Sequence, residues 1–137
     1  MSLALYEDDP GSRPVLASQI RATLARFREE PLRGRTVVLD NDGHAAGYAL
    51  LVSFWSNELG GEICTIDEIY VRPAWRCRGC GSRLIASLSS DRILWPAPPV
   101  AFELEVSPDN HRALDLYERL GFRLKRNRTL RRTGAPA

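Results

Sequence analysis

The feature that most constrains the fold is a stretch in which a strand pattern passes through a glycine-bearing turn into a helix pattern. Residues 63–71 are rich in apolar and β-branched side chains, and Pro73 ends this predicted strand. Gly79 and Gly81 follow in the turn, and apolar residues at helical spacing then predict a helix over residues 81–90. A strand that leads directly into a helix implies that the helix packs on a sheet, so we expect both element types in one domain.

The remaining patterns predict the order of the other elements. The helix nearest the N-terminus carries Leu16, Ile20, Leu24 and Phe27 at helical spacing and stops at Pro31. The first half is predicted as a helix over about 14–29 and strands over 36–39, 45–54 and 63–71, with a hairpin turn at 40–43. A helix over 81–90, a stiff connector at Pro96, Pro98 and Pro99 and a strand over 100–106 follow. The chain is then predicted to form a helix with Asp109 as N-cap and Gly121 at its C′ position, and a last strand that opens at Phe122. This order predicts an α/β or α+β domain with a mixed sheet.

Size and composition describe one ordinary globular domain. The chain has 137 residues, which suits a single core, and we treat residues 1–137 as one domain with a basic tail at 128–137. No apolar run approaches the roughly 18 residues of a membrane span, and the N-terminus lacks a signal-peptide pattern. A net charge of +2 does not argue for nucleic acid. Three cysteines form no disulfide framework, so we expect a cytoplasmic protein with reduced thiols.

The turn before the helix at 81–90 has the features of an anion site. The N-terminus of a helix presents unpaired backbone N–H groups and a partial positive charge. Gly79 and Gly81 lack a Cβ and let the backbone approach a phosphate closely, while Arg76 and Arg78 add charge. Neither a Walker loop nor a dinucleotide G-x-G-x-x-G is present. The turn therefore predicts a phosphate or pyrophosphate ligand, or else a tight strand-to-helix link alone.

Two motifs make the chain resemble the GNAT acetyltransferases. Val71-x-Pro73-x-x-Arg76-x-x-Gly79-x-Gly81 is similar to the family's motif A, [QR]-x-x-G-x-[GA] preceded by V-x-P. The second is Asn110-x-x-Ala113-x-x-x-Tyr117-x-x-x-Gly121-Phe122. The resemblance covers about residues 14–127 and implies a mainly antiparallel sheet flanked by helices.

The resemblance also implies a cosubstrate, acetyl-CoA, and the residues that bind it. Main-chain amides of the turn would hold its pyrophosphate. The strand end would pair with the pantetheine arm, and the Ile69 N–H would polarise the thioester carbonyl. Asn110 and Tyr117 would lie along the arm. The implied cofactor-binding set is Ile69, Tyr70, Val71, Arg76, Cys77, Arg78, Gly79, Cys80, Gly81, Ser82, Asn110 and Tyr117.

Acetyl transfer to an amine calls for a base, an oxyanion donor and an acid for the departing thiolate. Tyr117 is the candidate acid, because a phenol with a pKa near 10 stays protonated at neutral pH; the alternative role is a core aromatic. Glu105 matches the base position of ribosomal-protein N-terminal acetyltransferases, and Asp67 matches an E-D-x-x-V segment of polyamine acetyltransferases. Either carboxylate is otherwise a solvated or salt-bridged strand residue. Strand alternation points the neighbouring Glu68 to the opposite face.

The chain departs from the family pattern in two places. Members usually begin with a further strand and helix, but only about thirteen residues precede the helix at 14–29. We therefore expect the usual first strand and helix to be missing, whether by truncation, a mis-assigned start or an abbreviated N-terminus. A sheet edge left open in this way would be exposed or covered by a partner chain, which makes a homodimer possible. Position 77 is commonly glycine in the family but is Cys77 here.

Three functions follow as hypotheses. The first is acetyl-CoA-dependent N-acetylation of a primary amine, on a small molecule or a peptide N-terminus, by direct attack in a ternary complex. A non-catalytic acyl-CoA sensor of the same fold is the second. The third is redox or zinc chemistry at Cys77 and Cys80, which lacks a second pair of ligands. We expect no metal, no nucleic acid and no membrane partner, and the sequence leaves the acceptor amine open.

Overall fold

A single four-stranded sheet forms the centre of the protein. The computed structural model describes residues 1–11, 13–90, 97–127 and 129–134. The strand order is β1-β2-β3-β4, in which β1–β2 and β2–β3 are antiparallel and β3–β4 is parallel. The elements are α1 (Ser2–Asp8), α2 (Ala17–Glu29), β1 (Gly34–Asn41), β2 (His44–Ser56), β3 (Gly61–Val71), η1 (Pro73–Trp75), α3 (Cys80–Ser90), β4 (Ala101–Leu104) and α4 (His111–Arg119). The predicted mixed α+β class is confirmed.

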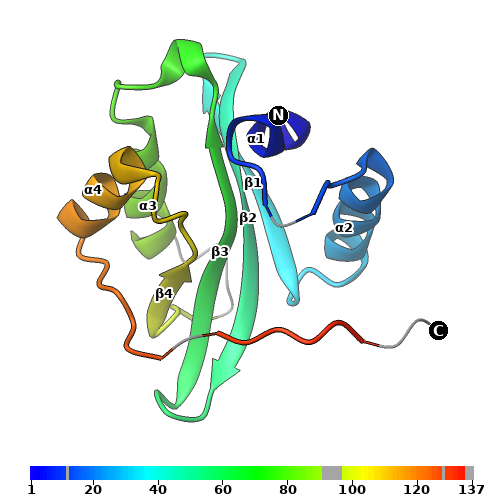
Figure 1. Ribbon diagram of the computed structural model, residues 1–137, viewed down its shortest axis with the longest axis vertical. Coiled ribbons are helices and arrows are strands. Elements are labelled where there is room, and N and C mark those ends of the chain that lie inside the picture. Colours follow the sequence, from blue (N-terminus) through cyan, green and yellow to red (C-terminus); the bar gives the residue numbers. More distant parts are fainter. Residues whose placement is uncertain (12, 91–96, 128, 135–137) are drawn as a thin grey trace.

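Helices cover both faces of the sheet. In Figure 1, α1 and α2 lie on one side of the strands, and α3 and α4 lie on the other. The larger core lies under α3 and α4, where Leu51 and Ile66 of the sheet meet Leu88 of α3 and Tyr117 of α4. A smaller cluster faces α1 and α2 and is formed by Tyr48, Leu50 and Tyr70, with Ala4, Leu5 and Phe27 packed against it. Side chains on a strand alternate between the two faces, so β2 and β3 supply both cores.

The turn between β1 and β2 has the conformation that its sequence predicts. Asp42 and Gly43 both have positive φ, at 51° and 80°. Asn41 and His44 pair directly across this two-residue loop. Two consecutive positive φ values match the twist of the flanking strands, which is why Asp-Gly is favoured there.

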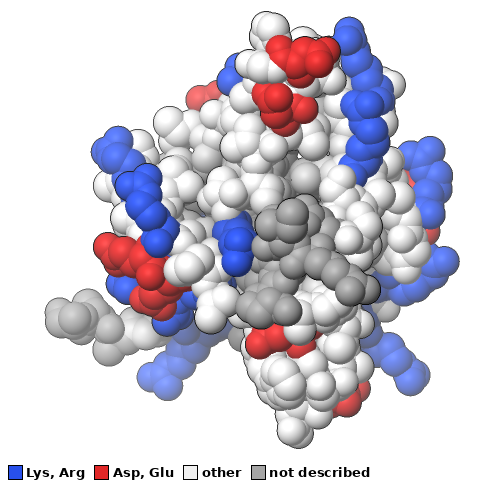
Figure 2. Space-filling model, turned by 180° about the vertical axis from the view of Figure 1, so that it is seen from behind, with Lys and Arg blue, Asp and Glu red and all other residues white. Residues whose placement is uncertain are grey.

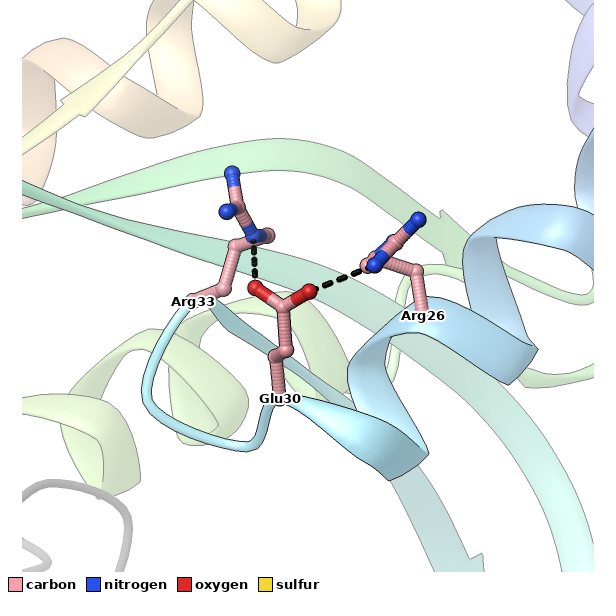
Figure 3. Close-up of polar contacts among 3 residues, drawn as sticks. All are labelled: Arg26, Glu30 and Arg33. Atoms are coloured by element: carbon pink, nitrogen blue, oxygen red, sulfur yellow. Dashed lines mark hydrogen bonds and ion pairs between the residues drawn. The ribbon is translucent and has the colours of Figure 1, made fainter.

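The connection from α2 to β1 is held by one carboxylate and two guanidinium groups. Glu30 accepts hydrogen bonds of 2.5 Å from Arg26 and from Arg33, as Figure 3 shows. Of the four apolar residues that predicted this helix, Ile20 and Phe27 are half-buried, whereas Leu16 is 62% exposed and Leu24 is 40% exposed. The helix starts later than predicted, at Ala17, with the exposed Leu16 as its N-cap.

The predicted last strand from Phe122 is wrong. Residues 121–127 form no ladder with any described strand. Phe122 packs edge-on against Tyr117, with ring centroids 5.8 Å apart, but Leu124, the next apolar residue, is 96% exposed. Lys125 reaches β4 only through its side chain, which pairs with Glu103 at 2.8 Å. A segment with one buried apolar residue among basic ones gains little by pairing with the sheet.

Two further details differ from the prediction at the helix ends. Asn110, not Asp109, caps α4, because the helix begins at His111 and Asn110 Oδ1 accepts the Ala113 N–H at 3.2 Å. The short helix α1 was not predicted, since its seven residues are too few for a clear period. We expected both a first strand and a first helix to be missing; the described residues before α2 contain no strand, but the helix α1 does precede α2. The connector at Pro96 lies partly outside the described residues.

The surface shows no single region of one charge on the face seen in Figure 2. Basic side chains there are spread around the outline and alternate with acidic ones. No helix in the described part of the chain has the length and apolarity of a membrane span.

Candidate active site

The sheet opens between β3 and β4 partway along their length. Ile63 to Ile66 of β3 pair with Ala101 to Leu104 of β4, and no pair follows among the described residues. The β2–β3 register shifts at this point, so that Leu50 faces Glu68 while Leu51 faces Ile66. Asp67 is thus an extra residue on β3, a bulge, and a bulge bends the strand that carries it. The last five residues of β3 therefore have a free edge.

Main-chain groups of this free edge face the opening. The Arg72 N–H donates to the Ala46 carbonyl of β2 at 2.8 Å. Backbone groups alternate in direction along a strand, so the N–H and C=O groups of Ile69 and Val71 point away from β2, toward the gap. Consistent with this direction, the Val71 carbonyl accepts a 2.8 Å hydrogen bond from Arg76 Nε. The Ile69 N–H therefore points into the gap between β3 and β4.

The turn between β3 and α3 presents a run of unpaired amides. Cys77 and Gly79 have positive φ, at 60° and 73°. The first helical bond runs from the Arg83 N–H to the Gly79 carbonyl at 3.0 Å. In the described part of the chain, the N–H groups of residues 77–82 have no hydrogen-bond acceptor. Left-handed residues alternating with right-handed ones gather such N–H groups into a concave anion site, and the helix N-terminus adds partial positive charge.

The gap and the turn form one continuous cleft of about 940 Å³. It is lined on one side by β3 and the turn and on the other by residues 104–107 and by α4. Of the predicted site residues, only Arg78 does not line it, because its guanidinium lies over the Trp75 ring, 5.5 Å from the centroid. The residues that do line it are Asp67, Ile69, Tyr70, Val71, Arg76, Cys77, Gly79, Cys80, Gly81, Ser82, Glu105, Asn110 and Tyr117.

Tyr117 is buried at the α4 wall of the cleft. Burial raises the pKa of its phenol, and the negative charge of Asp9 raises it further. The hydroxyl thus stays protonated well above neutral pH, as a proton donor requires. The residue is also part of the larger core, so both roles considered from the sequence are compatible with its position.

The carboxylates Asp67, Glu105 and Glu68 have different surroundings. Asp67 is exposed in the cleft, and its pKa is raised by loss of hydration and by the negative charges of Glu68 and Glu105. Glu105 follows the end of β4 and lines the same cleft. Glu68 is buried toward α1 and accepts hydrogen bonds from Tyr6 at 2.5 Å, Tyr48 at 2.6 Å and Ser2 at 3.3 Å. Its lone pairs are therefore largely taken by hydroxyl donors.

The structure adds site residues that the sequence reasoning missed. Arg112 in the first turn of α4 places Nη2 2.9 Å from Cys77 Sγ, beside the amide-lined turn. The sequence could have indicated Arg112, because this residue lies two positions after Asn110 in the second motif. Tyr6 and Asp9 from the N-terminal segment also line the cleft. No local pattern marked these two, since only folding brings residues 5–11 to the sheet.

The two cysteines of the turn have different surroundings. Cys77 is exposed, whereas Cys80 is buried and contacts Arg83 Nη2 through its sulfur at 3.3 Å. Within the described ranges, no group of three or more His, Cys, Asp or Glu side chains is arranged to hold a metal ion.

Comparison with known proteins identifies the class of fold. The "Acetyltransferase (GNAT) family" model matches residues 3–122. A possible acetyltransferase from Clostridium difficile 630 superposes with a TM-score of 0.79 at 16% identity, covering 98% of this chain and 88% of that one. An integron cassette protein from the mobile metagenome of Cole Harbour Salt Marsh gives 0.75 at 24% identity, covering 99% and 82%. No curated protein matches the sequence significantly.

A third solved structure carries a bound ligand. AAC(6')-Iy in complex with a bisubstrate analogue, CoA-S-monomethyl-acetylneamine, superposes with a TM-score of 0.72 at 19% identity and covers 95% of this chain and 86% of that one. The fold is therefore that of an acetyltransferase domain. Because the family model spans most of the sequence, this chain belongs to the GNAT acetyltransferase family.

Proposed function

We propose that the protein transfers the acetyl group of acetyl-CoA to a primary amine, by direct attack of the amine in a ternary complex. The observation that carries this proposal is the combination of a free β3 edge with a run of unpaired amides at its end. A diphosphate fits that run, and an extended amide-bearing arm fits the edge. The N-acetyltransferase AAC(6')-Iy, crystallised with CoA, shares the fold and supports an amine acceptor.

The residues present fit this cosubstrate at both ends of the cleft. The amides of residues 77–82 would hold the diphosphate, with Arg112 adding charge beside them. Gly79 needs its positive φ, and a Cβ there would meet nothing within 4 Å, so the turn is open toward a ligand. Ile69 and Val71 would pair with the pantetheine arm. When bound, acetyl-CoA supplies a thioester with an electrophilic carbonyl carbon.

The chain's own groups would move the protons. An acceptor amine arrives mostly as an ammonium ion and must lose a proton before it attacks. Asp67 or Glu105 would accept that proton, directly or through water, and the raised pKa of Asp67 brings its basicity closer to what the task needs. The Ile69 N–H would stabilise the oxyanion, and the Tyr117 phenol would donate a proton to the departing thiolate.

A test of this function uses a panel of polyamines, aminoglycosides, amino acids and N-terminal peptides with acetyl-CoA, and follows release of the free CoA thiol. We expect turnover with at least one amine and a rate lower by on the order of a hundredfold in Tyr117→Phe. Turnover that is unchanged in Tyr117→Phe would remove the acid from the mechanism.

A second candidate is a domain that binds acyl-CoA as a sensor without turnover. One solved structure with this fold, from Bacillus halodurans C-125, is described as a transcriptional regulator; it has a TM-score of 0.72 at 19% identity. Thermal stabilisation by acetyl-CoA with no thiol release for any amine would favour the sensor.

A further inference from the structure

The N-terminal segment reaches across the cleft and contacts the residues assigned to the cofactor. Asp8, the last residue of α1, places Oδ2 2.6 Å from Arg76 Nη2 at the start of the turn. The next residue, Asp9, accepts a long hydrogen bond of 3.5 Å from Asn110 Nδ2 at the start of α4. Asp9, Pro10 and Gly11 all line the cleft. Asp9 thus lies in the cleft beside Asn110, and Asp8 pairs with Arg76 at the start of the turn.

Arg76 makes three contacts within the chain while Asp8 is in place. Its Nε donates to the Val71 carbonyl at 2.8 Å, and its guanidinium lies over the Tyr70 ring, 5.4 Å from the centroid. The remaining edge of the guanidinium faces Asp8. The ion pair is half-exposed, with 34% of the Arg76 side chain and 50% of the Asp8 side chain accessible. The positive charge of Arg76 is therefore balanced within the chain and is not offered to an incoming anion.

The side-chain amide of Asn110 also makes two contacts within the chain. Its Oδ1 caps α4 by accepting the Ala113 N–H, which leaves the amide nitrogen to face the cleft. That nitrogen is directed at Asp9. The charge of Asp9 is also felt by Tyr117, whose pKa it raises. The segment therefore contacts the predicted cofactor site on both walls.

The start of α1 is attached more firmly than its end. Tyr6 and Ser2 both donate to the buried Glu68, and Leu5 packs on the cluster of Tyr48, Leu50 and Tyr70. Beyond Asp8 the contacts are the two polar ones described above and the N–H of Asp9, which closes the helix on the Leu5 carbonyl at 2.8 Å. Residues 8–11 can therefore leave the cleft without unpacking the apolar side of α1.

We propose that Asp8 and Asp9 form an acidic strap that engages Arg76 and Asn110 at the cleft and must be displaced when the cofactor's diphosphate binds. This inference rests on the proposed function, because it takes acetyl-CoA as the incoming ligand. Carboxylates and phosphate oxygens compete for the same donors, and their like charges repel one another at short range. The strap makes acetyl-CoA affinity depend on residues that contribute no contact to the bound complex.

The test compares acetyl-CoA binding by titration calorimetry in the wild-type protein, Asp8→Asn, Asp9→Asn and the double variant. Each single change keeps the side-chain shape and removes one negative charge. We expect the dissociation constant to fall on the order of fivefold per substitution. Glu7→Gln is the matched control, because Glu7 is an exposed carboxylate of the same helix that, among the described contacts, pairs with neither Arg76 nor Asn110. Its affinity should equal that of the wild type.

Hydrogen exchange gives a second readout that does not depend on turnover. Adding acetyl-CoA to the wild-type protein should speed exchange at the Asp9 amide while the amides of β3 are protected. The strap would be overturned by unchanged or weaker binding in both aspartate variants, by an equal gain in affinity in Glu7→Gln, or by protection of the Asp9 amide. In each case, binding of acetyl-CoA to the wild-type protein would still support the cofactor assignment. Failure of every variant and the wild type to bind acetyl-CoA would overturn the proposed function as well.

Discussion

Arg112 Nη2 lies 2.9 Å from Cys77 Sγ, so the first turn of α4 touches the loop that precedes α3. The two motifs of the sequence meet at this contact, 35 residues apart in the chain. Arg112 is exposed, and its guanidinium stands beside the unpaired amides of the turn. We infer that it contributes charge to the diphosphate end of the cleft.

Removing that charge should weaken acetyl-CoA binding. Arg112→Gln is expected to raise the dissociation constant about fivefold, the effect of one half-solvated charge pair. Titration calorimetry at low and high salt measures it, and the difference from the wild type should shrink as salt rises. Arg21→Gln on α2, an exposed arginine on the opposite side of the sheet, serves as the control and should bind as the wild type does. Equal affinities for both variants would contradict the assignment.

Glycine at position 77 should stabilise the fold. Cys77 has a φ of 60°, which costs an ordinary residue roughly 1 to 2 kcal/mol. Glycine adopts this conformation without strain. Its unfolded chain has more conformational entropy, which lowers the free energy of unfolding by about 0.5 to 1 kcal/mol. We therefore expect Cys77→Gly to raise the free energy of unfolding by about 0.5 to 1 kcal/mol, measured by urea denaturation. Cys77→Ala keeps the strain and should show no gain, so equal gains in both variants would exclude backbone strain as the cause.

The pH dependence of the rate should identify the base. The pKa of Asp67 is raised by loss of hydration and by nearby carboxylates, one of which is Glu105. A base must be ionised, so the rate should rise with pH through the raised pKa of Asp67. Glu105→Gln removes one of the charges that raise this pKa and should move the rise to lower pH. Asp67→Asn should lower the rate on the order of a hundredfold. The reverse pattern, with loss of turnover in Glu105→Gln alone, would make Glu105 the base.

Alkaline pH should destabilise the protein through its buried phenols. The pKa values of Tyr6 and Tyr48 are raised, first by burial and then by their hydrogen bonds to Glu68. The folded protein therefore holds these protons at a pH where the unfolded chain has released them, above about 10. Stability is fully present below that pH and should fall as pH rises beyond it. Unfolding measured from pH 8 to 11 should show a shallower fall in Tyr6→Phe than in the wild type.

The substitution Tyr6→Phe also tests, at neutral pH, the hydrogen bond from Tyr6 to Glu68. Tyr6→Phe removes one of three donors to the buried Glu68 and should lower the free energy of unfolding by about 1 to 2 kcal/mol. Tyr70, which packs with Tyr48 and Leu50, has no such bond to Glu68 among the described contacts, and Tyr70→Phe should cost less. An equal loss in both variants would argue against the role of the Tyr6 bond.

Local sequence signals predicted most of the elements because each rests on short-range physics. Asp42-Gly43 tolerates the positive φ of its turn, and Gly121 adopts a φ of 92° just after α4, where the sequence placed the helix end. The predicted strand from Phe122 was wrong because Leu124, the next apolar residue, has nothing to pack on. The short helix α1 was not predicted, because its stability comes from contacts with β2 and β3 rather than from its own pattern.

For the site, the sequence by itself determined which residues are the candidates. Gly79, Gly81, Asn110 and Tyr117 stand at spacings that resemble one family, and the local turn and helix starts follow from those letters. Strand alternation already predicted opposite faces for Asp67 and Glu68, but the tertiary structure alone buried Glu68 among hydroxyl groups, because folding brings Ser2, Tyr6 and Tyr48 to it. It alone placed Asp8 and Asp9 against Arg76 and Asn110. Contacts between residues about 70 to 100 positions apart depend on how the chain packs, and no local pattern encodes them.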